Sequence, residues 1–182
     1  MILNINISSR KTITSDDLIF SNLIKRYKIN NLPAIIVSGD VSNKQIVDVW
    51  KPLKGVTEDK NIVIQNLVPF YSLAEQRPKG IVDTILLKDK TCQDCFDENR
   101  YITETRRIGI TIGNSVVYDT SSPEGASLVK KYNITKVPTL LLSRDVGDYP
   151  GFATFWKSVG TRENDNMFVF REVQKMGKYK NL

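Results

Sequence analysis

The chain has 182 residues and a mass of 20.7 kDa, is 41% hydrophobic and 25% charged, and carries a net charge of +6. This length fits one large domain or two small ones, and the composition is typical of a soluble globular protein. The sequence contains no histidine and only two cysteines. It therefore excludes a Cys₂His₂ zinc site, a Ser-His-Asp triad and a Cys-His protease dyad within this chain.

Charge and hydropathy also limit the partners that we expect. No apolar run approaches the roughly 18 residues that cross a bilayer, so no membrane-spanning segment and no secretion signal are predicted. The basic residues are dispersed, with small clusters such as Arg106-Arg107 and Lys130-Lys131. A nucleic-acid surface needs a dense basic stripe, so we expect no nucleic-acid partner. No cofactor is predicted, and a soluble chain of this kind fits the cytoplasm or the extracytoplasmic part of an anchored parent.

The first half of the chain predicts a small α/β unit. A helix is expected up to about Tyr27, and an apolar strand follows Pro33. A β-hairpin is predicted over residues 58–64, with a turn of Glu, Asp, Lys and Asn. Trp50 is expected to be a packing residue. The polar stretch 74–80, which contains Pro78 and Gly80, predicts a boundary.

The second half predicts a longer series of elements. Expected strands cover 81–87, 116–118, 139–143, 152–159 and 167–171, and expected helices cover 92–107 and 123–132. The second helix has clear start signals, because Ser121 and Ser122 can cap it and Pro123 suits its first turn. The fold class predicted from this order is α/β, with a central mixed sheet flanked by helices.

The two halves also resemble each other in sequence. When the chain is shifted along itself so that Leu23 meets Leu128, matching residues recur at the same offset. These pairs include Lys25 and Lys130, Tyr27 and Tyr132, Ile29 and Ile134, Pro33 and Pro138, and Asp40 and Asp145. The agreement predicts an internal repeat, with an incomplete first copy at 1–73 and a complete second copy at 81–182. We therefore expect a fragment or a shortened relative of a tandem protein.

Two motifs of the second half carry the chemistry. The tetrad Cys92-Gln93-Asp94-Cys95 follows an apolar strand, and Val137-Pro138-Thr139 opens another strand after two intervening helices. This layout resembles the thioredoxin-like superfamily, over the range from Ile81 to about Gly160. The resemblance implies a thioredoxin-like fold, a Cys92–Cys95 redox disulfide and a cis-proline at Pro138.

The resemblance also implies roles for individual residues. Cys92 is the expected nucleophile and Cys95 the resolving thiol, while Val137, Pro138 and Thr139 are the expected substrate-binding residues. We expect Cys92 at the N-terminus of a helix, where free N–H groups favour its thiolate. The backbone of Val137 is expected to pair with an extended substrate chain.

The residues around the cysteines depart from the family's common forms. Gln93 and Asp94 stand between them and Thr91 precedes the first cysteine, where thioredoxins usually carry Gly-Pro and Trp. The negative charge of Asp94 raises the expected pKa of Cys92. A less stabilised thiolate predicts a reducing pair, nearer to thioredoxin than to the strong periplasmic oxidants.

Three functions are compatible with these residues. The first is a thiol–disulfide oxidoreductase that acts on protein thiols and disulfides and depends on an unidentified reductase or electron donor. The second is a redox-inactive binding or scaffold module with a structural Cys92–Cys95 disulfide. The third and weakest is a thiolate metal carrier that uses Cys92 and Cys95 across a dimer, although no metal site is predicted within one chain.

Overall fold

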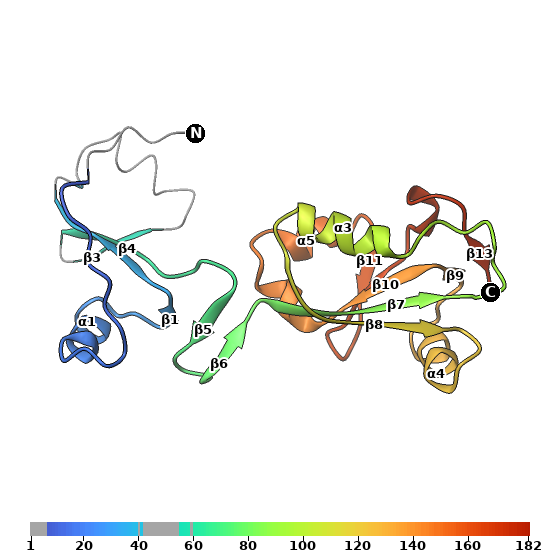
Figure 1. Ribbon diagram of the computed structural model, residues 1–182, viewed down its shortest axis with the longest axis horizontal. Coiled ribbons are helices and arrows are strands. Elements are labelled where there is room, and N and C mark those ends of the chain that lie inside the picture. The colour runs from blue at the N-terminus through green and yellow to red at the C-terminus, as the bar shows by residue number, and fades with distance from the viewer. Residues whose placement is uncertain (1–6, 40, 42–54, 59) are drawn as a thin grey trace. The chain divides into compact units, whose positions relative to one another are not determined.

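The computed structural model describes residues 7–39, 41, 55–58 and 60–182 (Figure 1). The chain divides into two compact units, Met1–Lys79 and Gly80–Leu182, and both contain helical and strand elements. The predicted α/β class with a mixed sheet is confirmed in the second unit. Among the described residues, no helix combines the length and the apolar character needed to cross a membrane.

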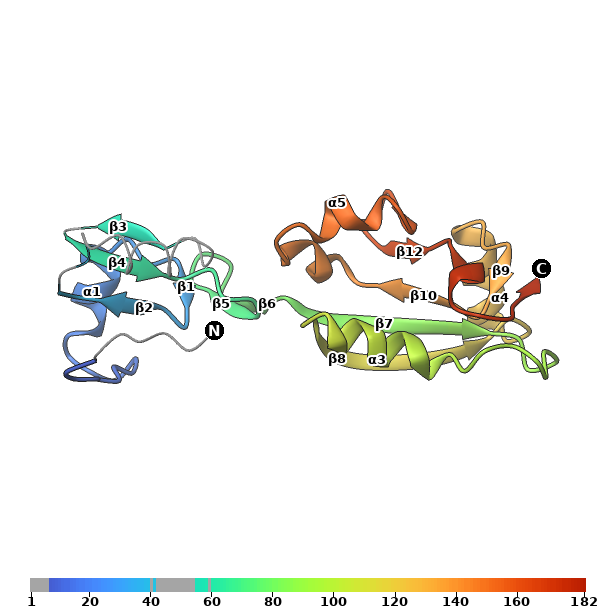
Figure 2. The same cartoon turned by 90° about the horizontal axis from the view of Figure 1, so that it is seen from above.

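A five-stranded sheet forms the centre of the second unit, in the order β11-β12-β10-β7-β8. Its strands are β7 (Ile81–Lys88), β8 (Thr111–Asp119), β10 (Thr139–Leu142), β11 (Gly160–Arg162) and β12 (Phe168–Phe170). Strands β7 and β8 run side by side and parallel, while the other neighbours pair antiparallel (Figure 2). Strand β10 is buried along its whole length, so both faces of the sheet need cover.

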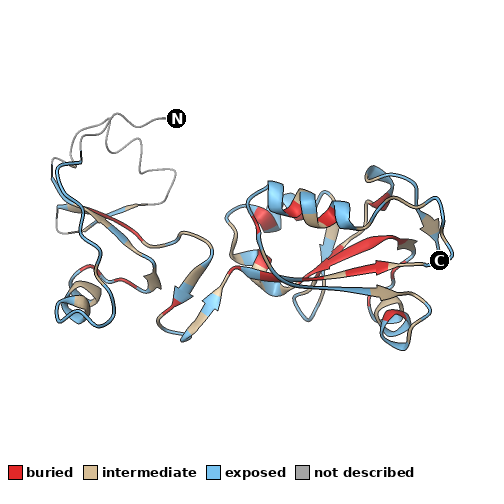
Figure 3. Cartoon of the chain, viewed as in Figure 1, coloured by how far each residue is buried: buried red, intermediate tan, exposed pale blue. Residues whose placement is uncertain are grey.

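Helices supply this cover on both faces of the sheet (Figure 1). They are α3 (Asn99–Arg107), α4 (Pro123–Lys131) and α5 (Phe152–Trp156). The short 3₁₀ turns η2 (Arg144–Asp148) and η3 (Val173–Lys175) follow β10 and β12. Tyr101 of α3 and Trp156 of α5 belong to one core cluster with β7 and β10. Leu128 of α4 and the following Tyr132 pack in a second cluster. The buried residues of this unit thus lie along the central strands and the inner sides of the helices (Figure 3).

Helix α4 begins where the sequence predicts. The hydroxyl of Ser122 accepts a hydrogen bond from the Gly125 amide at 3.0 Å, and Pro123 occupies the first turn. Gly125 also sits against the end of β8, because a Cβ there would lie 1.9 Å from the carbonyl oxygen of Asp119. Only glycine allows this helix to approach the strand so closely.

The predicted helix over 92–107 is wrong in its first half. The helix begins only at Asn99, and both cysteines lie in turns before it. Local side-chain bonds compete with the helix there, since the Asp97 carboxylate accepts a hydrogen bond from the Asn99 amide at 2.9 Å. The Phe96 amide donates a hydrogen bond to the carbonyl of Lys178 at 2.9 Å and so takes no part in a helix.

The predicted strand over 152–159 is also wrong. Residues Phe152–Trp156 form α5, and the strand of this region is the shorter β11. Phe152 and Trp156 are four residues apart, which places both on one helical face, where their rings stack with centroids 5.1 Å apart. The remaining predicted strands correspond to β7, β8, β10 and β12, although β8 is much longer than predicted.

The first unit contains one described helix and two three-stranded sheets. Its elements are α1 (Phe20–Arg26), β1 (Asn31–Leu32), β2 (Ile35–Val37), β3 (Val56–Glu58), β4 (Asn61–Ile64), β5 (Phe70–Ser72) and β6 (Arg77–Lys79). The predicted hairpin is confirmed, because β3 and β4 pair antiparallel with Glu58 opposite Asn61. Trp50 lies outside the described residues.

Both units contain the same local sequence of features around a proline. Each has a helix, a tyrosine, a residue with φ of 49°, an isoleucine, a two-residue strand and a cis-proline. In the first unit these are α1, Tyr27, Lys28, Ile29, β1 and Pro33. In the second they are α4, Tyr132, Asn133, Ile134, β9 (Lys136–Val137) and Pro138. The two-residue strands also find similar partners, since β1 pairs antiparallel with β5 and β9 pairs antiparallel with β13 (Lys180–Asn181).

The aromatic core of the second unit provides a test of this packing. Phe168 is 1% exposed and its ring meets those of Phe152 and Trp156, whereas Phe155 is 53% exposed. We expect Phe168→Ala to lower the free energy of unfolding by about 3–5 kcal/mol, because it leaves a cavity in the core. The same substitution at Phe155 is expected to cost at most about 1 kcal/mol. Urea unfolding followed by tryptophan fluorescence measures both, and equal losses would contradict the core assignment.

Candidate functional site

The two cysteines form a disulfide in the loop that follows β7. Cys92 and Cys95 are bonded to each other, with their Cα atoms 5.5 Å apart, and both are half-buried. The loop leaves the sheet at Lys88 and enters α3 at Asn99. It therefore holds the disulfide at the carboxyl end of a central strand.

Hydrogen bonds to two carboxylates shape this loop. Asp89 accepts from the amide of Thr91 at 2.8 Å and from its hydroxyl at 2.6 Å. Asp119, at the end of β8, accepts from the Lys90 amide at 2.7 Å. The ammonium of Lys180 together with the Thr91 groups lowers the pKa of Asp89 to about 2. Asp89 is therefore a fixed negative charge at neutral pH.

The charges around Cys92 differ from those expected of a helix terminus. Because Cys92 lies outside α3, the N–H groups at the start of that helix do not stabilise its thiolate. Asp94 is exposed, and the ammonium of Lys178 lies 3.5 Å from its carboxylate. Lys88, the nearest basic residue on β7, pairs with Glu98. These arrangements leave little net positive charge to favour a thiolate at Cys92.

The predicted substrate-binding segment lies against the second cysteine. The Val137–Pro138 peptide bond is cis, and the Val137 carbonyl oxygen lies 3.7 Å from the Cys95 sulfur. The buried hydroxyl of Tyr101 donates to the Pro138 carbonyl at 3.0 Å, so α3 fixes this turn. Burial raises the pKa of Tyr101, which keeps the hydroxyl protonated as a donor. The Thr139 hydroxyl instead donates to the Phe170 carbonyl at 2.7 Å and holds β10 to β12.

The chain's last residues, 177–182, also belong to the site, and we call them the C-terminal strap. The strap reaches the disulfide loop and the segment before Pro138, where β13 pairs with β9. A surface hollow of about 500 Å³ is lined by Cys92 and Asp94 on one side and by Gly177, Lys178 and Tyr179 on the other. Sequence analysis missed the strap because it lacks an apolar pattern and its partners are distant in the chain.

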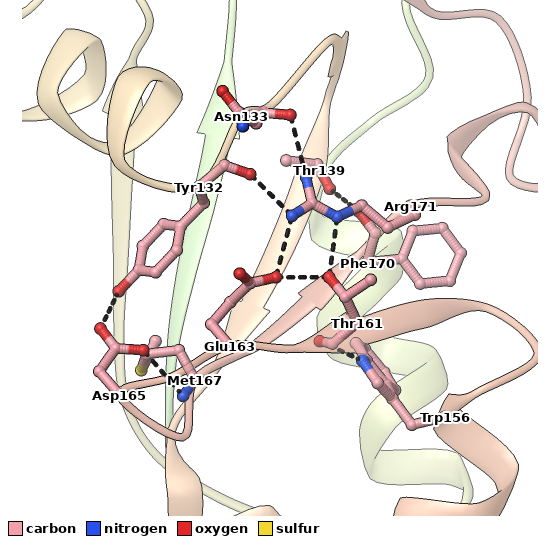
Figure 4. Close-up of polar contacts among 10 residues, drawn as sticks. All are labelled: Tyr132, Asn133, Thr139, Trp156, Thr161, Glu163, Asp165, Met167, Phe170 and Arg171. Atoms are coloured by element: carbon pink, nitrogen blue, oxygen red, sulfur yellow. Dashed lines mark hydrogen bonds and ion pairs between the residues drawn. The ribbon is translucent and has the colours of Figure 1, made fainter.

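A network around Arg171 holds α4 against the hairpin of β11 and β12 (Figure 4). The Arg171 guanidinium donates to the carbonyls of Tyr132 at 2.7 Å and Asn133 at 3.2 Å, which lie where α4 ends. It also donates to the Thr161 hydroxyl and pairs with Glu163, each at 2.9 Å. Since the chain runs from Asn133 directly into β9, this network places the segment that contacts Cys95.

The described residues offer no group of three or more Cys, Asp or Glu side chains arranged to hold a metal ion. Comparisons with protein-family models, with curated proteins and with solved structures found no significant match for this chain. The chemistry of the site therefore rests on its own groups. These are a disulfide, a cis-proline turn against one of its sulfur atoms, and a surface hollow beside the other cysteine.

Asp165 gives a pH test of the network that positions this turn. Its carboxylate accepts from the Tyr132 hydroxyl at 2.8 Å and pairs with Lys131 at 2.7 Å, and these groups lower its pKa to about 2 from 3.8. Because the pKa of Asp165 is lower in the folded than in the unfolded state, its carboxylate stabilises the fold fully above the unfolded-state pKa. This stabilisation disappears as the pH falls through the folded-state pKa. We expect Asp165→Asn to cost about 0.5–1 kcal/mol at neutral pH, since both partners are partly exposed.

The measurement is urea unfolding of both proteins at pH 7 and at steps between pH 4 and pH 2. The difference between wild type and variant is expected to shrink steadily over the acidic steps. A difference that stays constant down to pH 2 would show that the charge of Asp165 does not contribute.

Proposed function

We propose that this chain is a thiol–disulfide oxidoreductase of the thioredoxin-like type, with Cys92 as nucleophile and Cys95 as resolving thiol. The observation that carries the proposal is the Cys92–Cys95 disulfide beside the Val137–Pro138 turn, with the Val137 carbonyl oxygen 3.7 Å from the Cys95 sulfur. A disulfide alone is common in structural roles. A disulfide beside a cis-proline turn, at the end of a central strand, is the arrangement that the sequence resemblance implies.

The order of elements supports the thioredoxin-like fold as part of this proposal. The second unit runs from β7 through the cysteine loop, α3, parallel β8 and α4 to Pro138, and then through antiparallel β10 and β12. This is the series of strand, CxxC, helix, strand, helix, proline and strand that the sequence resemblance implies. The long β8, the short α5 and the late start of α3 are departures within it.

Access to the two sulfur atoms supports the division of roles. Cys92 lines the surface hollow, whereas Cys95 faces the Val137 carbonyl. In the reduced protein the Cys95 thiol can donate its hydrogen to this carbonyl, and a hydrogen bond to the neutral form disfavours the thiolate. Cys92 is then the easier of the two to ionise, and it is the one that lines the surface hollow.

The reaction follows from these positions. The Cys92 thiolate attacks one sulfur of a substrate disulfide, forms a mixed disulfide and releases the first substrate thiolate. Cys95 then loses its proton and attacks the Cys92 sulfur, which releases the second substrate thiolate and closes the Cys92–Cys95 disulfide. Two electrons and two protons pass to the substrate, and a dithiol reductant restores the pair.

We also infer that the two units are copies of one ancestral segment. The support is the shared series of features around Pro33 and Pro138 and the similar pairing of β1 and β9. The chain's only two cysteines belong to the second unit, so the first unit has no redox pair. It serves a packing or partner-binding role under this proposal.

One observation favours the alternative of a binding or scaffold module with a structural disulfide. The C-terminal strap contacts the loop that carries the pair, and both cysteines are half-buried. A disulfide that no polypeptide substrate reaches acts as a cross-link. The thiolate metal carrier is the weakest alternative, because both thiols are in the disulfide and further ligands must come from another chain.

Reduction of insulin disulfides by dithiothreitol separates an enzyme from a scaffold. We expect the wild-type chain to accelerate insulin precipitation by at least about tenfold over dithiothreitol alone, and Cys92→Ser to abolish the acceleration. Cys95→Ser is the matched variant, because it keeps the nucleophile but cannot resolve the mixed disulfide. Mass spectrometry is then expected to detect an insulin adduct with Cys95→Ser and none with Cys92→Ser. A wild-type rate equal to that of Cys92→Ser would support the scaffold.

The reduction potential tests the electrostatic part of the proposal. Without help from a helix terminus, and with Asp94 nearby, the Cys92 thiolate is poorly stabilised, which favours the disulfide. Equilibration with a dithiothreitol buffer is expected to give a potential below about −220 mV, closer to thioredoxin than to DsbA. Asp94→Asn is expected to raise it, while Glu124→Gln, which removes a charge from α4, leaves it unchanged. A potential above about −150 mV would contradict this electrostatic account.

A further inference from the structure

The backbone of the C-terminal strap fills the edge of β9 next to the disulfide. Within β13 and β9, Lys180 lies opposite Val137 and Asn181 lies opposite Lys136 in an antiparallel pair. The Leu182 amide extends the pairing by donating to the carbonyl of Thr135 at 2.9 Å. This is the backbone edge at which an extended polypeptide substrate is expected to pair, directly before Pro138.

Side chains of the strap also bind the disulfide loop. The Lys180 ammonium lies between the Asp89 carboxylate and the Thr91 hydroxyl, 2.8 Å from the latter. The Lys178 ammonium approaches the Asp94 carboxylate at 3.5 Å, and the Lys178 carbonyl accepts from the Phe96 amide at 2.9 Å. The strap thus holds both sides of the site, the cysteine loop and the proline segment.

We propose that the C-terminal strap is an internal occupant of the polypeptide-binding edge of the redox site, and that it must leave β9 before a protein substrate reaches Cys92. The proposal rests on the thiol–disulfide function proposed above and adds a means of regulating it. Binding of a protein substrate and closure of the strap are then mutually exclusive, so the closed fraction lowers the apparent affinity for substrate.

The strap is held in a way that allows it to leave. None of residues 177–182 is buried, and its contacts are hydrogen bonds, ion pairs and a cation–π contact between Lys136 and Tyr179. The chain before it is anchored, because Val173 is 1% exposed in the core. Gly177, the first residue of the strap, follows the anchored part directly. Its φ is 148°, and a Cβ added there would lie only 3.0 Å from the Cβ of Phe96. An opening at Gly177 therefore removes no buried residue of the strap from the core.

In the first unit, the strand at the corresponding edge is part of a larger sheet. There β5 pairs with β1 before Pro33, but β5 also pairs with β6 on its other side and contains the buried Ser72. In contrast, β13 forms a two-stranded sheet with β9 alone. The edge beside the disulfide is thus covered by a single strand of two residues, whereas the edge without cysteines is built into a three-stranded sheet.

The contacts of Lys180 indicate which polypeptides displace the strap. Asp89 carries a fixed negative charge, and with Thr91 it provides oxygen acceptors for one basic side chain. An extended substrate that takes the place of β13 leaves the Asp89 Oδ2 oxygen without its ammonium partner unless it brings a lysine or arginine to the same position. We therefore expect polypeptides with a basic residue at this position to compete best.

Removal of the strap gives the first test. A chain that ends at Met176 is expected to reduce insulin at least about fivefold faster than the full chain at low substrate concentration, because no closed state competes. Reaction of the reduced Cys92 with iodoacetamide, a small reagent, is expected to change less than twofold, as the hollow already reaches Cys92. Circular dichroism and urea unfolding establish that the shortened chain is folded. An unchanged insulin rate in a folded shortened chain would overturn the proposal.

A binding measurement makes the test independent of catalysis. The free peptide Gly-Lys-Tyr-Lys-Asn-Leu, which has the sequence of the strap, is labelled with a fluorophore and titrated into the shortened chain and into the full chain in their oxidised forms. We expect saturable binding to the shortened chain, binding at least about fivefold weaker to the full chain, and weaker binding of the peptide with glutamate in place of its second lysine. If the peptide binds but insulin is not reduced, the proposed function fails and the strap site stands. Insulin reduction without peptide binding would overturn the strap instead.

A full-length variant covers the case in which the shortened chain does not fold. Lys180→Glu places a like charge against Asp89 and is expected to raise the insulin rate by at least about twofold. Lys175→Glu is the matched control with the same charge change, since Lys175 contacts Glu172 outside the strap, and its rate is expected to stay at the wild-type value. Equal rates for Lys180→Glu, Lys175→Glu and wild type would contradict the role of Lys180.

Discussion

The register between β7 and β10 is the constraint on which the site depends. The two strands pair antiparallel with Leu87 opposite Thr139. The last residues of β7 and the first residues of β10 therefore lie at the same end of the sheet. The loop with Cys92 and Cys95 leaves at this end of β7, and Pro138 immediately precedes β10. Buried and exposed residues alternate in the first half of β7, and a shift of one residue there would turn the buried ones outward. Burial of this strand therefore fixes the meeting of Cys95 and Val137.

The segment before Pro138 is held by two further elements. Tyr101 of α3 donates to the Pro138 carbonyl from one core cluster, and Arg171 binds the carbonyls at the end of α4 on the other side of the sheet. Buried or partly buried polar groups of this kind cost stability when they lose a partner, so they specify one position of the chain. The proline turn is therefore held by contacts other than the disulfide.

Much of this arrangement could be read from the sequence, and the failures have physical reasons. The apolar runs of β7 and β10 and the Ser122 cap of α4 are local signals, and they predicted these elements correctly. The start of α3 was missed because Asp97 and Asp89 bind nearby amides and form turns that compete with helix. The α5 region was wrongly predicted as a strand, because aromatic residues favour strands. In the structure it is a helix, which places Phe152 and Trp156, four residues apart, on one buried face.

The candidate site divides in the same way. Cys92, Cys95 and Pro138 belong to short motifs that can be recognised from the sequence and from their spacing. The strap is not, because Lys180 recognises Asp89 and the backbone of Val137 across the fold, without an apolar pattern. Polar contacts between residues so far apart in the chain cannot be predicted before the register of the sheet is known.

Under the closure proposed for the strap, its free energy determines whether the molecule behaves as an enzyme or as a scaffold. Its contacts are a few backbone hydrogen bonds and partly exposed ion pairs, each of which contributes on the order of 1 kcal/mol or less after the cost of ordering the chain. A net closure of about 2 kcal/mol would leave roughly 3% of molecules open, which allows turnover with a raised apparent KM. A net closure of about 5 kcal/mol would leave fewer than about one molecule in a thousand open, and the disulfide would then act as a structural cross-link. Under this proposal the same fold and the same cysteines support either behaviour, depending on the free energy with which the strap binds the cysteine loop and β9.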